Sequence, residues 1–373
     1  MTEQVALVKC STYQPDEVSA ALAGLSSLLA ASMPWPQGKK VLVKPNLLLP
    51  KSPESAALTH PALVEEIVRK LQSLNCEVII GDSPGGPVLA SLQNTVYKVS
   101  GMAAVAKNTG CRLLTEMVPA SVTYPEGKIL KRLEVVQAMT EADLIVNVSK
   151  LKTHGLTLLS GAVKNMFGGV PGLKKAEYHL RMPQVPDFCQ AMTDICCYFA
   201  PSINIMDAVI GMEGDGPSGG NPRQAGCLLA SANPFALDLA AAALIGIEPP
   251  EKAPILKVAL ERGLTPPLAD LKILGEDLAV FCQKDWKKPK ITTGQRSPAL
   301  FSRFIQRYPL FLADNCNGCG ICAKSCPPKV ITMREQRPTV DLSKCIHCFC
   351  CQELCPRQAV KIKKPWLSRI LAK

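Results

Sequence analysis

Two runs of cysteines near the C-terminal end have the residue types and spacing of an electron-transfer centre. In each run three cysteines are separated by two residues, and after three further residues comes a fourth cysteine followed by proline. This spacing is typical of two-cluster ferredoxins, in which the fourth cysteine of each run ligates the other 4Fe-4S cluster. We therefore expect two crossed ligand sets, which are Cys316, Cys319, Cys322 and Cys355 for one cluster and Cys345, Cys348, Cys351 and Cys326 for the other.

Zinc binding and a disulfide framework are the alternatives for these cysteines. A zinc ribbon usually has two separated Cys-x2-Cys pairs, so the repeated run of four cysteines favours clusters. The chain has 17 cysteines and no evident export signal, which favours metal ligation in a reducing cytoplasm and an anaerobic or low-oxygen host. Cys350 lies inside the second run but off its spacing, and we interpret it as a small buried apolar residue.

Polar residues also gather where predicted strands end in the larger, N-terminal part of the chain. Lys44 and Asn46 follow one apolar run, and Asp82 and Ser83 begin a glycine-rich turn after the next. The loops beyond the carboxyl ends of parallel strands form the ligand crevice of such sheets, so we expect these four residues to bind an anionic substrate. An ordinary strand-terminal turn is the alternative. The turn is neither a P-loop nor a G-x-G-x-x-G fingerprint, so nucleotide binding is not indicated.

The richest polar segment runs from residue 149 to residue 169. Lys150, Lys152 and Lys164 could bind a carboxylate or phosphate group, and we place the first two among the substrate-binding residues. His154 could donate a proton near neutral pH, although a histidine taken alone is more often structural. We predict His154 and Lys164 as catalytic residues, with His60 as a second candidate for the proton donor.

Short apolar runs alternate with helical patterns along the N-terminal part of the chain. This order of strands and helices indicates an α/β fold with a largely parallel sheet and covering helices. A small α+β domain of the bacterial two-cluster ferredoxin type is expected to follow. The predicted strands are 4–9, 40–44, 77–81, 143–148, 203–207, 227–230 and 271–274. The predicted helices are 15–31, 61–74, 187–199, 234–245 and 251–262.

Three regions follow from composition. We predict an α/β domain over residues 1–282, a basic linker over 283–306, and a ferredoxin-type domain with a basic tail over 307–373. The formal charge of +11 falls to about +7 when two clusters, each about −2 with its thiolates, are counted. Aromatic residues make up only 5% of the chain, so we expect no nucleic-acid partner, and we see no membrane span.

Several segments together resemble a family known as domain of unknown function three-six-two, whose members are described as iron-sulfur cluster-binding proteins. The matching segments are VLVKPNLL, GDSPGG, SKLKTHGLTLLSGAVKNMFGGVPG, KAEYHLRMPQVPDF, MEGDGPSGGNP and CIHCFCCQELCP. The resemblance implies a cytoplasmic redox protein without an agreed substrate. The layout from His154 to Lys164 is also similar to the catalytic segment of nickel-pincer lactate racemases. Apart from His60, the chain has no equivalent of their other histidines, so nickel is not expected.

We therefore expect an oxidoreductase in which two 4Fe-4S clusters relay low-potential electrons to a substrate or cofactor in the α/β domain. A redox partner protein and an anionic small molecule are the expected partners. A flavin or further metal is possible, but no motif indicates one. The alternative is a non-enzymatic electron carrier or a partner in metallocentre assembly, in which the larger domain serves as a docking platform.

Overall fold

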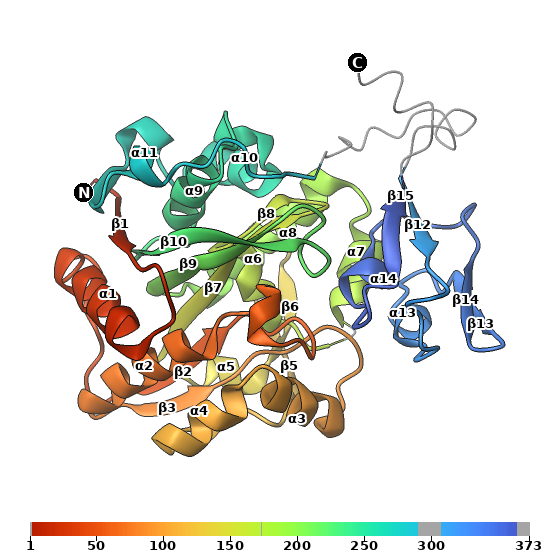
Figure 1. Ribbon diagram of the computed structural model, residues 1–373, viewed down its shortest axis with the longest axis horizontal. Helices are drawn as coiled ribbons and strands as arrows, with labels where there is room; N and C mark the ends of the chain where they lie inside the picture. Colours follow the sequence, from red (N-terminus) through yellow and green to blue (C-terminus); the bar gives the residue numbers. More distant parts are fainter. Residues whose placement is uncertain (1, 173, 290–306, 364–373) are drawn as a thin grey trace.

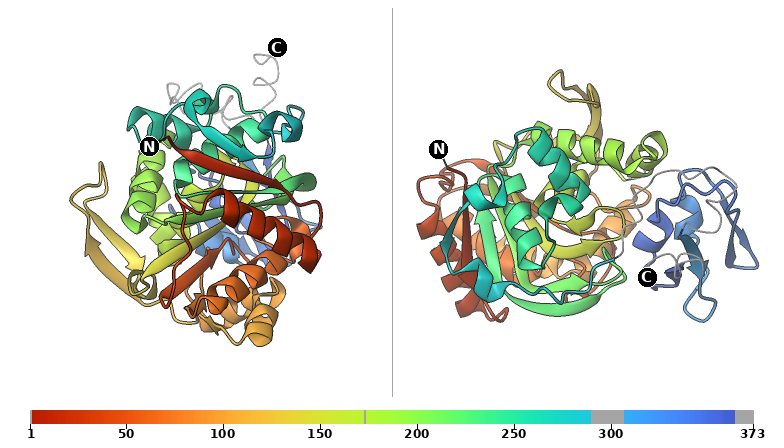
Figure 2. Two further views of the ribbon diagram at one scale, coloured as in Figure 1. Left: turned by 90° about the vertical axis from the view of Figure 1, so that its left-hand side faces the viewer. Right: turned by 90° about the horizontal axis from the view of Figure 1, so that it is seen from above.

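The computed structural model describes residues 2–172, 174–289 and 307–363. A large α/β unit carries a smaller C-terminal unit on one side, as Figure 1 and the right-hand view of Figure 2 show. Residues 290–306 of the predicted linker and residues 364–373 of the predicted basic tail lie outside the described residues.

A nine-stranded mixed sheet forms the centre of the α/β unit. Its strands pair in the order β11-β1-β10-β9-β7-β2-β3-β4, and β8 pairs with β7 at one end. Neighbouring strands are parallel in the pairs β7–β2, β2–β3, β3–β4, β7–β9 and β1–β11. They are antiparallel in the pairs β1–β10, β10–β9 and β7–β8. In sheet order the bounds are Lys272–Gly275, Gln4–Lys9, Asn221–Ser231, Ile203–Glu213, Leu144–His154, Lys40–Pro45, Glu77–Ile80 and Arg112–Leu113, with Leu158–Ser160 for β8.

Helices cover both faces of this sheet because its strands carry apolar residues on both sides. In β2, Val41 and Val43 belong to one hydrophobic core, whereas Leu42 between them belongs to another. This alternation follows from the two-residue period of a strand. The first core lies against α1 (Pro15–Leu28), α2 (Pro61–Ser73), α3 (Ala90–Val99) and α4 (Met102–Thr109). The opposite face packs against α8 (Val185–Phe199), α9 (Pro234–Leu244) and α10 (Pro254–Glu261).

The predicted largely parallel α/β class is confirmed, and the structure differs from the prediction mainly in strand length. Strands β7 and β9 extend well beyond the predicted ends at residues 148 and 207. Residues 149–154, which we expected in a loop, therefore belong to a buried strand. Charged residues can occupy a central strand here because distant side chains pair with them, and sequence periodicity does not reveal such pairing.

Several short elements lack a clear sequence signal. A hairpin of β5 (Pro119–Thr123) and β6 (Arg132–Val136) leads into α5 (Gln137–Thr140). After β8 the chain forms α6 (Ala162–Asn165), a 3-10 turn at Met166–Gly169, and α7 (Lys174–Arg181). Helix α7 lies beside the C-terminal unit in Figure 1, and the stretch from α6 to α7 supplies much of the site described below. Further 3-10 turns at Pro53–Ser55, Pro250–Lys252 and Leu268–Asp270 and helix α11 (Leu278–Phe281) complete the unit.

The described start of the predicted linker is attached to the α/β unit. Trp286 is only 2% exposed and belongs to the core that packs on α9. The N–H of Gln283 donates to the carbonyl of Leu244, and the N–H of Gly214 donates to the carbonyl of Lys287. Residues 283–287 are thus held by the α/β unit through both backbone and side-chain contacts.

Over residues 307–363 the C-terminal unit consists of two small antiparallel two-stranded sheets and two short helices that carry cysteines. Strand β12 pairs antiparallel with β15, and β13 pairs antiparallel with β14. The bounds are Tyr308–Phe311 for β12, Ile321–Lys324 for α13, Ile331–Arg334 for β13, Arg337–Val340 for β14, Cys350–Glu353 for α14 and Val360–Lys363 for β15. The shared sheet β12–β15 joins the two ends of the unit, which brings the two cysteine runs side by side.

Helix α14 and the residue after it dock on the α/β unit. The Ser218 hydroxyl donates to the carbonyl of Glu353 over 2.8 Å, and the Gln352 side-chain amide donates to the carbonyl of Asp215 over 3.1 Å. Leu354 packs so closely on Gly85 that a Cβ there would overlap its side chain. The docked segment belongs to the second cysteine run, so that run faces the larger unit.

Candidate functional site

The cysteines of the two runs surround two separate small cavities, each of about 340 Å³. One cavity is lined by Cys316, Cys319, Cys322 and Cys355, and the other by Cys326, Cys345, Cys348, Cys350 and Cys351. These groupings correspond to the two crossed sets expected from the spacing, with Cys350 added to the second. All of these cysteines are free thiols. Across the described ranges, no three His, Cys, Asp or Glu side chains converge as the ligands of one metal ion do.

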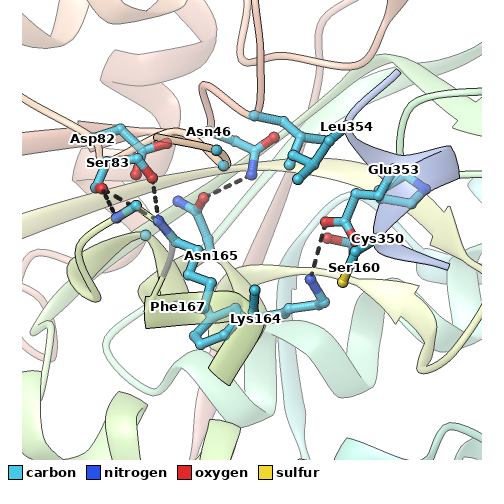
Figure 3. A pocket seen from close by; sticks show the side chains of 18 of the residues that line it. Asn46, Asp82, Ser83, Ser160, Lys164, Asn165, Phe167, Cys350, Glu353 and Leu354 are labelled. Carbon is cyan, nitrogen blue, oxygen red and sulfur yellow. Dashed lines mark hydrogen bonds and ion pairs between the residues drawn. The ribbon is translucent and has the colours of Figure 1, made fainter. Parts of the chain in front are cut away.

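A larger cavity of about 700 Å³ lies between the α/β unit and helix α14 (Figure 3). Strand ends, the α6 region and α7 supply one wall, and the second cysteine run supplies Cys350, Glu353 and Leu354. Among the sequence-predicted site residues, five line this cavity, namely Asn46, Asp82, Ser83, Lys152 and Lys164.

Lys44 and Asp82 form a buried ion pair behind the cavity wall. The Lys44 Nζ atom lies 2.8 Å from Asp82 Oδ1, and Lys44 is fully buried. Asp82 Oδ2 accepts the N–H of Leu47 over 2.7 Å. A Cβ at Gly168 would overlap both members of the pair, so this position requires glycine. Lys44 therefore fixes the loop structure and does not itself line the cavity, in contrast to the substrate-binding role predicted from its position.

An amide network holds Lys152 in place on strand β7. The Lys152 Nζ atom donates to Asn46 Oδ1 over 2.7 Å and to the carbonyl of Ala57 over 2.9 Å. The Asn46 amide donates to Asn165 Oδ1 over 2.9 Å, as Figure 3 shows, and Asn165 donates in turn to Asn147. Burial, reinforced by Lys164, lowers the pKa of Lys152 to about 7. A buried ammonium group held by neutral acceptors is suited to meeting an anion or releasing a proton.

His154 ends β7 and is not among the residues that line the cavity, but its ring lies next to Glu353, which does line it. Its Nδ1 atom accepts the N–H groups of Leu156 and Thr157 over 3.0 and 3.3 Å, which assigns the ring hydrogen to Nε2. Nε2 is buried and has no hydrogen-bond partner among the described residues. Burial, together with Lys164 and Lys152, holds the pKa of His154 well below its usual value. The imidazole is therefore neutral and presents an unused N–H donor.

The C-terminal unit contributes the carboxylate that faces these donors. Glu353 Oε1 lies 3.8 Å from Lys164 Nζ, and Glu353 Oε2 lies 3.9 Å from His154 Nε2. Both separations exceed hydrogen-bond length. The dashed line between Lys164 and Glu353 in Figure 3 marks the first contact, with Cys350 beside it. The α/β unit and the second cysteine run therefore meet through opposite charges inside the cavity.

Two further basic residues, both from α7, line the cavity and were missed by sequence reasoning. Lys175 Nζ donates to the carbonyl of Ser83 over 2.6 Å, and burial lowers its pKa to about 7. His179 stacks on Phe188, and burial lowers the pKa of His179 to about 4. Their spacing of four residues on one helix places both on the same face, which is the signal that could have identified them.

Lys150 and His60 belong to a different buried cluster and do not line the cavity. Lys150 Nζ pairs with Asp207 Oδ2 over 2.8 Å and donates to the Tyr13 hydroxyl over the same distance. His60 stacks on Tyr13 with 3.6 Å between ring centroids, and its backbone N–H donates to Asp207. A register irregularity in β7 between Lys150 and Lys152 accompanies this separation. The structure thus groups His154 and Lys164 but places His60 elsewhere.

The iron-sulfur class of the protein follows from this arrangement and from its relatives. The chain belongs to the family described as Domain of unknown function (DUF362), whose model matches residues 41–243. A second model, described as a 4Fe-4S dicluster domain, matches residues 315–359. The predicted family and architecture are thereby confirmed, and the cavity described above lies where the two matched regions meet.

Three individual relatives illustrate the similarity. A thylakoid-associated protein of Synechocystis is 27% identical over 300 residues, which cover 78% of this chain and 89% of the relative. One component of an ion-translocating oxidoreductase complex of Methanosarcina acetivorans is 35% identical over 48 residues, or 13% of this chain and 18% of that component. The apoprotein of lactate racemase from Thermoanaerobacterium thermosaccharolyticum has a TM-score of 0.39 and 16% identity, covering 65% of this chain and 57% of the racemase.

Within the described part of the chain, no helix is both long and apolar enough to cross a lipid bilayer.

Proposed function

We propose that this iron-sulfur protein is an oxidoreductase in which two 4Fe-4S clusters pass electrons to a small anionic molecule held in the large cavity. The observation that carries the proposal is the position of Cys350, which lines both the large cavity and the cavity of the second cysteine set. Electron transfer needs a short path, and a residue shared by the linings of both cavities favours one. The predicted cytoplasmic location and a protein electron donor remain part of this proposal.

The two cysteine cavities support clusters as the resident redox groups. One is bordered by the four thiols of its expected set and the other by its four and Cys350, both cavities draw on the two runs as crossed ligation requires, and no disulfide competes for these cysteines. When bound, 4Fe-4S clusters supply single electrons at low potential. Two such groups, reduced by an external low-potential donor protein, provide the two electrons that reduction of a closed-shell organic molecule consumes together with protons.

The side chains of the cavity support an anionic substrate. Lys152, Lys164 and Lys175 line it, while the Asp82 carboxylate is already neutralised by Lys44. A cationic wall offsets both the charge of the substrate and the negative charge that each arriving electron adds. Asn46 orients Lys152.

The pKa directions favour lysine over histidine as the proton donor. Sequence reasoning assigned the proton to His154, but burial keeps the pKa of this imidazole far below neutrality, so it has no extra proton to give. The ammonium group of Lys152 has a pKa of about 7, which suits proton transfer near neutral pH. We therefore assign proton donation to Lys152 and hydrogen-bond donation to His154.

The proposal is tested on the full chain purified without oxygen. Native mass spectrometry gives the resident groups, and the reduced protein is then mixed with a panel of small organic anions while cluster absorbance is followed. Reoxidation by one anion class in the wild type, with loss of that reaction in Lys152→Met at unchanged iron content, is the expected result. Failure of every anion, combined with capture of a stable protein partner, would favour the alternative of an electron carrier or metallocentre-assembly partner.

A further inference from the structure

The large cavity contains more positive than negative charge, and one carboxylate is left to balance it. Three lysines line the cavity, together with the carboxylates of Asp82 and Glu353. Asp82 is committed to Lys44 and to the N–H of Leu47. Glu353, which enters from the C-terminal unit, is therefore the carboxylate that faces the remaining cations of the described cavity wall.

Glu353 is held loosely in this position. Its two oxygens lie 3.8 Å from Lys164 Nζ and 3.9 Å from His154 Nε2, and no described residue donates a hydrogen bond to either oxygen. The backbone of Glu353 is anchored instead, because its carbonyl accepts from the Ser218 hydroxyl over 2.8 Å. The side chain can thus swing away while the helix stays docked.

His154 supplies an independent sign that a ligand belongs here. Its Nε2 atom is buried, the residue is 4% exposed, and this nitrogen has no hydrogen-bond partner among the described residues. A buried donor left unpaired costs about 1–3 kcal/mol, so such a group is normally satisfied by a ligand or water. Glu353 Oε2, at 3.9 Å, is too far away to accept a hydrogen bond from His154 Nε2.

We propose that the cavity binds a small organic carboxylate, which displaces the Glu353 side chain and accepts hydrogen bonds from His154 Nε2 and Lys164 Nζ. Glu353 then acts as a tethered competitor that fills the carboxylate position in the absence of ligand. This inference rests on the proposed function, since it names the chemical class of the molecule that the cavity would hold.

The geometry favours a carboxylate over a phosphate group. Phosphate sites usually draw on several free backbone N–H groups of a glycine-rich loop. In the loop that follows β3, three such groups are already used, because the N–H groups of Gly81, Ser83 and Gly85 donate to the carbonyls of Val43, Gly168 and Leu48, respectively. Lys164 Nζ and His154 Nε2 each face one oxygen of Glu353, so the same two donors match the two oxygens of a carboxylate ligand that takes its place.

Apolar residues on the rest of the wall indicate that the ligand has an organic portion. Leu48, Phe167, Ala176 and Leu354 line the same cavity. Burying apolar carbon against such side chains contributes about 25 cal/mol per Å² of surface. An inorganic anion gains nothing from this part of the wall.

The test removes the competitor and supplies free carboxylates. Glu353→Ala in the cluster-loaded full chain leaves a carboxylate-sized space, and acetate and propionate are titrated calorimetrically at constant ionic strength, with phosphate for comparison. The variant is expected to bind the carboxylates roughly tenfold tighter than the wild type. Adding Lys164→Met or His154→Phe to Glu353→Ala should remove that gain. Glu353→Gln, which keeps the size of the side chain but removes its charge, should give a smaller gain.

Other outcomes separate this inference from the proposed function. Equal carboxylate affinity in wild type and Glu353→Ala, or an equal gain for phosphate, would overturn the inference. Iron content and visible absorbance of each variant show whether the clusters survive, and Glu353→Gln serves if Glu353→Ala loses them. Carboxylate binding without reoxidation of the reduced clusters would contradict the proposed electron transfer to the ligand but support the carboxylate site. Reoxidation by an anion that lacks a carboxylate would support the electron transfer but contradict the carboxylate site.

Discussion

Gly85 and Leu354 touch across the boundary between the α/β unit and the second cysteine run, and no Cβ can be added at Gly85 without overlapping Leu354. This contact fixes how closely helix α14 approaches the large cavity. The distances from Glu353 to Lys164 and His154 depend on it, because Glu353 precedes Leu354 in the chain. Docking of the small unit and the geometry of the site are therefore coupled.

Gly85→Ala is expected to push α14 away from the α/β unit without unfolding either. Hydrogen exchange should become faster at the backbone amide of Leu354, which donates to the carbonyl of Cys350. The double variant Gly85→Ala with Leu354→Ala removes the overlap and should restore slow exchange. Unchanged exchange in Gly85→Ala would show that the contact is easily relaxed.

The buried pair of Lys44 and Asp82 is expected to stabilise the loop only as a pair. Lys44→Met leaves Asp82 charged and buried, which should lower the free energy of unfolding by about 3–5 kcal/mol. Adding Asp82→Asn removes the isolated charge, so the double variant should be more stable than Lys44→Met alone. Urea unfolding of the wild type, Lys44→Met, Asp82→Asn and the double variant measures this, and strictly additive losses would argue against a direct interaction.

The cysteine sets predict iron contents that distinguish ligands from the extra thiol. The wild type should hold about eight irons, and Cys355→Ala or Cys326→Ala should each lose about four, because each removes a ligand of a different cluster. Cys350→Ala should keep all of them, since this residue lies off the repeated spacing. Iron analysis after anaerobic reconstitution tests the prediction. Loss of a whole cluster from Cys350→Ala would place this thiol among the ligands.

Carboxylate binding should weaken as the pH rises through neutrality. Burial, reinforced by Lys164, lowers the pKa of Lys152 to about 7, and burial does the same for Lys175. Below this pH both are ammonium groups that attract an anion, and above it they become neutral. Glu353 and Asp82 oppose the shift in Lys152. Acetate binding to Glu353→Ala, titrated from pH 6 to pH 9, should lose affinity with rising pH.

A matched variant separates this effect from general instability. Lys152→Met in the Glu353→Ala background should bind acetate less tightly at pH 6 and show a flatter pH profile. An affinity for acetate that stays constant from pH 6 to pH 9 in Glu353→Ala would contradict the assignment of neutral-range titration to these lysines.

The fold class could be predicted because it depends on the pattern of residues along the chain. The continuous apolar run of Val41, Leu42 and Val43 is visible in sequence, and the structure places these residues in opposite cores, as a strand covered on both faces requires. The cysteine ligand sets come from spacing alone, and cysteines of each set line one of the two small cavities, but their ligation of clusters stays a prediction.

The pairing of charges could not be predicted, since it joins residues far apart in the chain. Lys150 belongs to the same polar segment of the sequence as Lys152, yet its ammonium group pairs with Asp207 and donates to the Tyr13 hydroxyl. Glu353 lies within a cysteine run and has no sequence feature that connects it with His154. Lys175 was missed because a lysine on a polar helix is ordinarily a solvated residue.

Helix α14 lines both the large cavity and the small cavity of the second cysteine set, with residues that are close in sequence. Cys351 borders the small cavity of the second cysteine set, and Glu353 borders the large one. In a system of two separate proteins, the electron-transfer module and the binding pocket could diverge independently. Here a change in this short helix alters both at once, so specialisation of the pocket and of the neighbouring cysteine centre must proceed together.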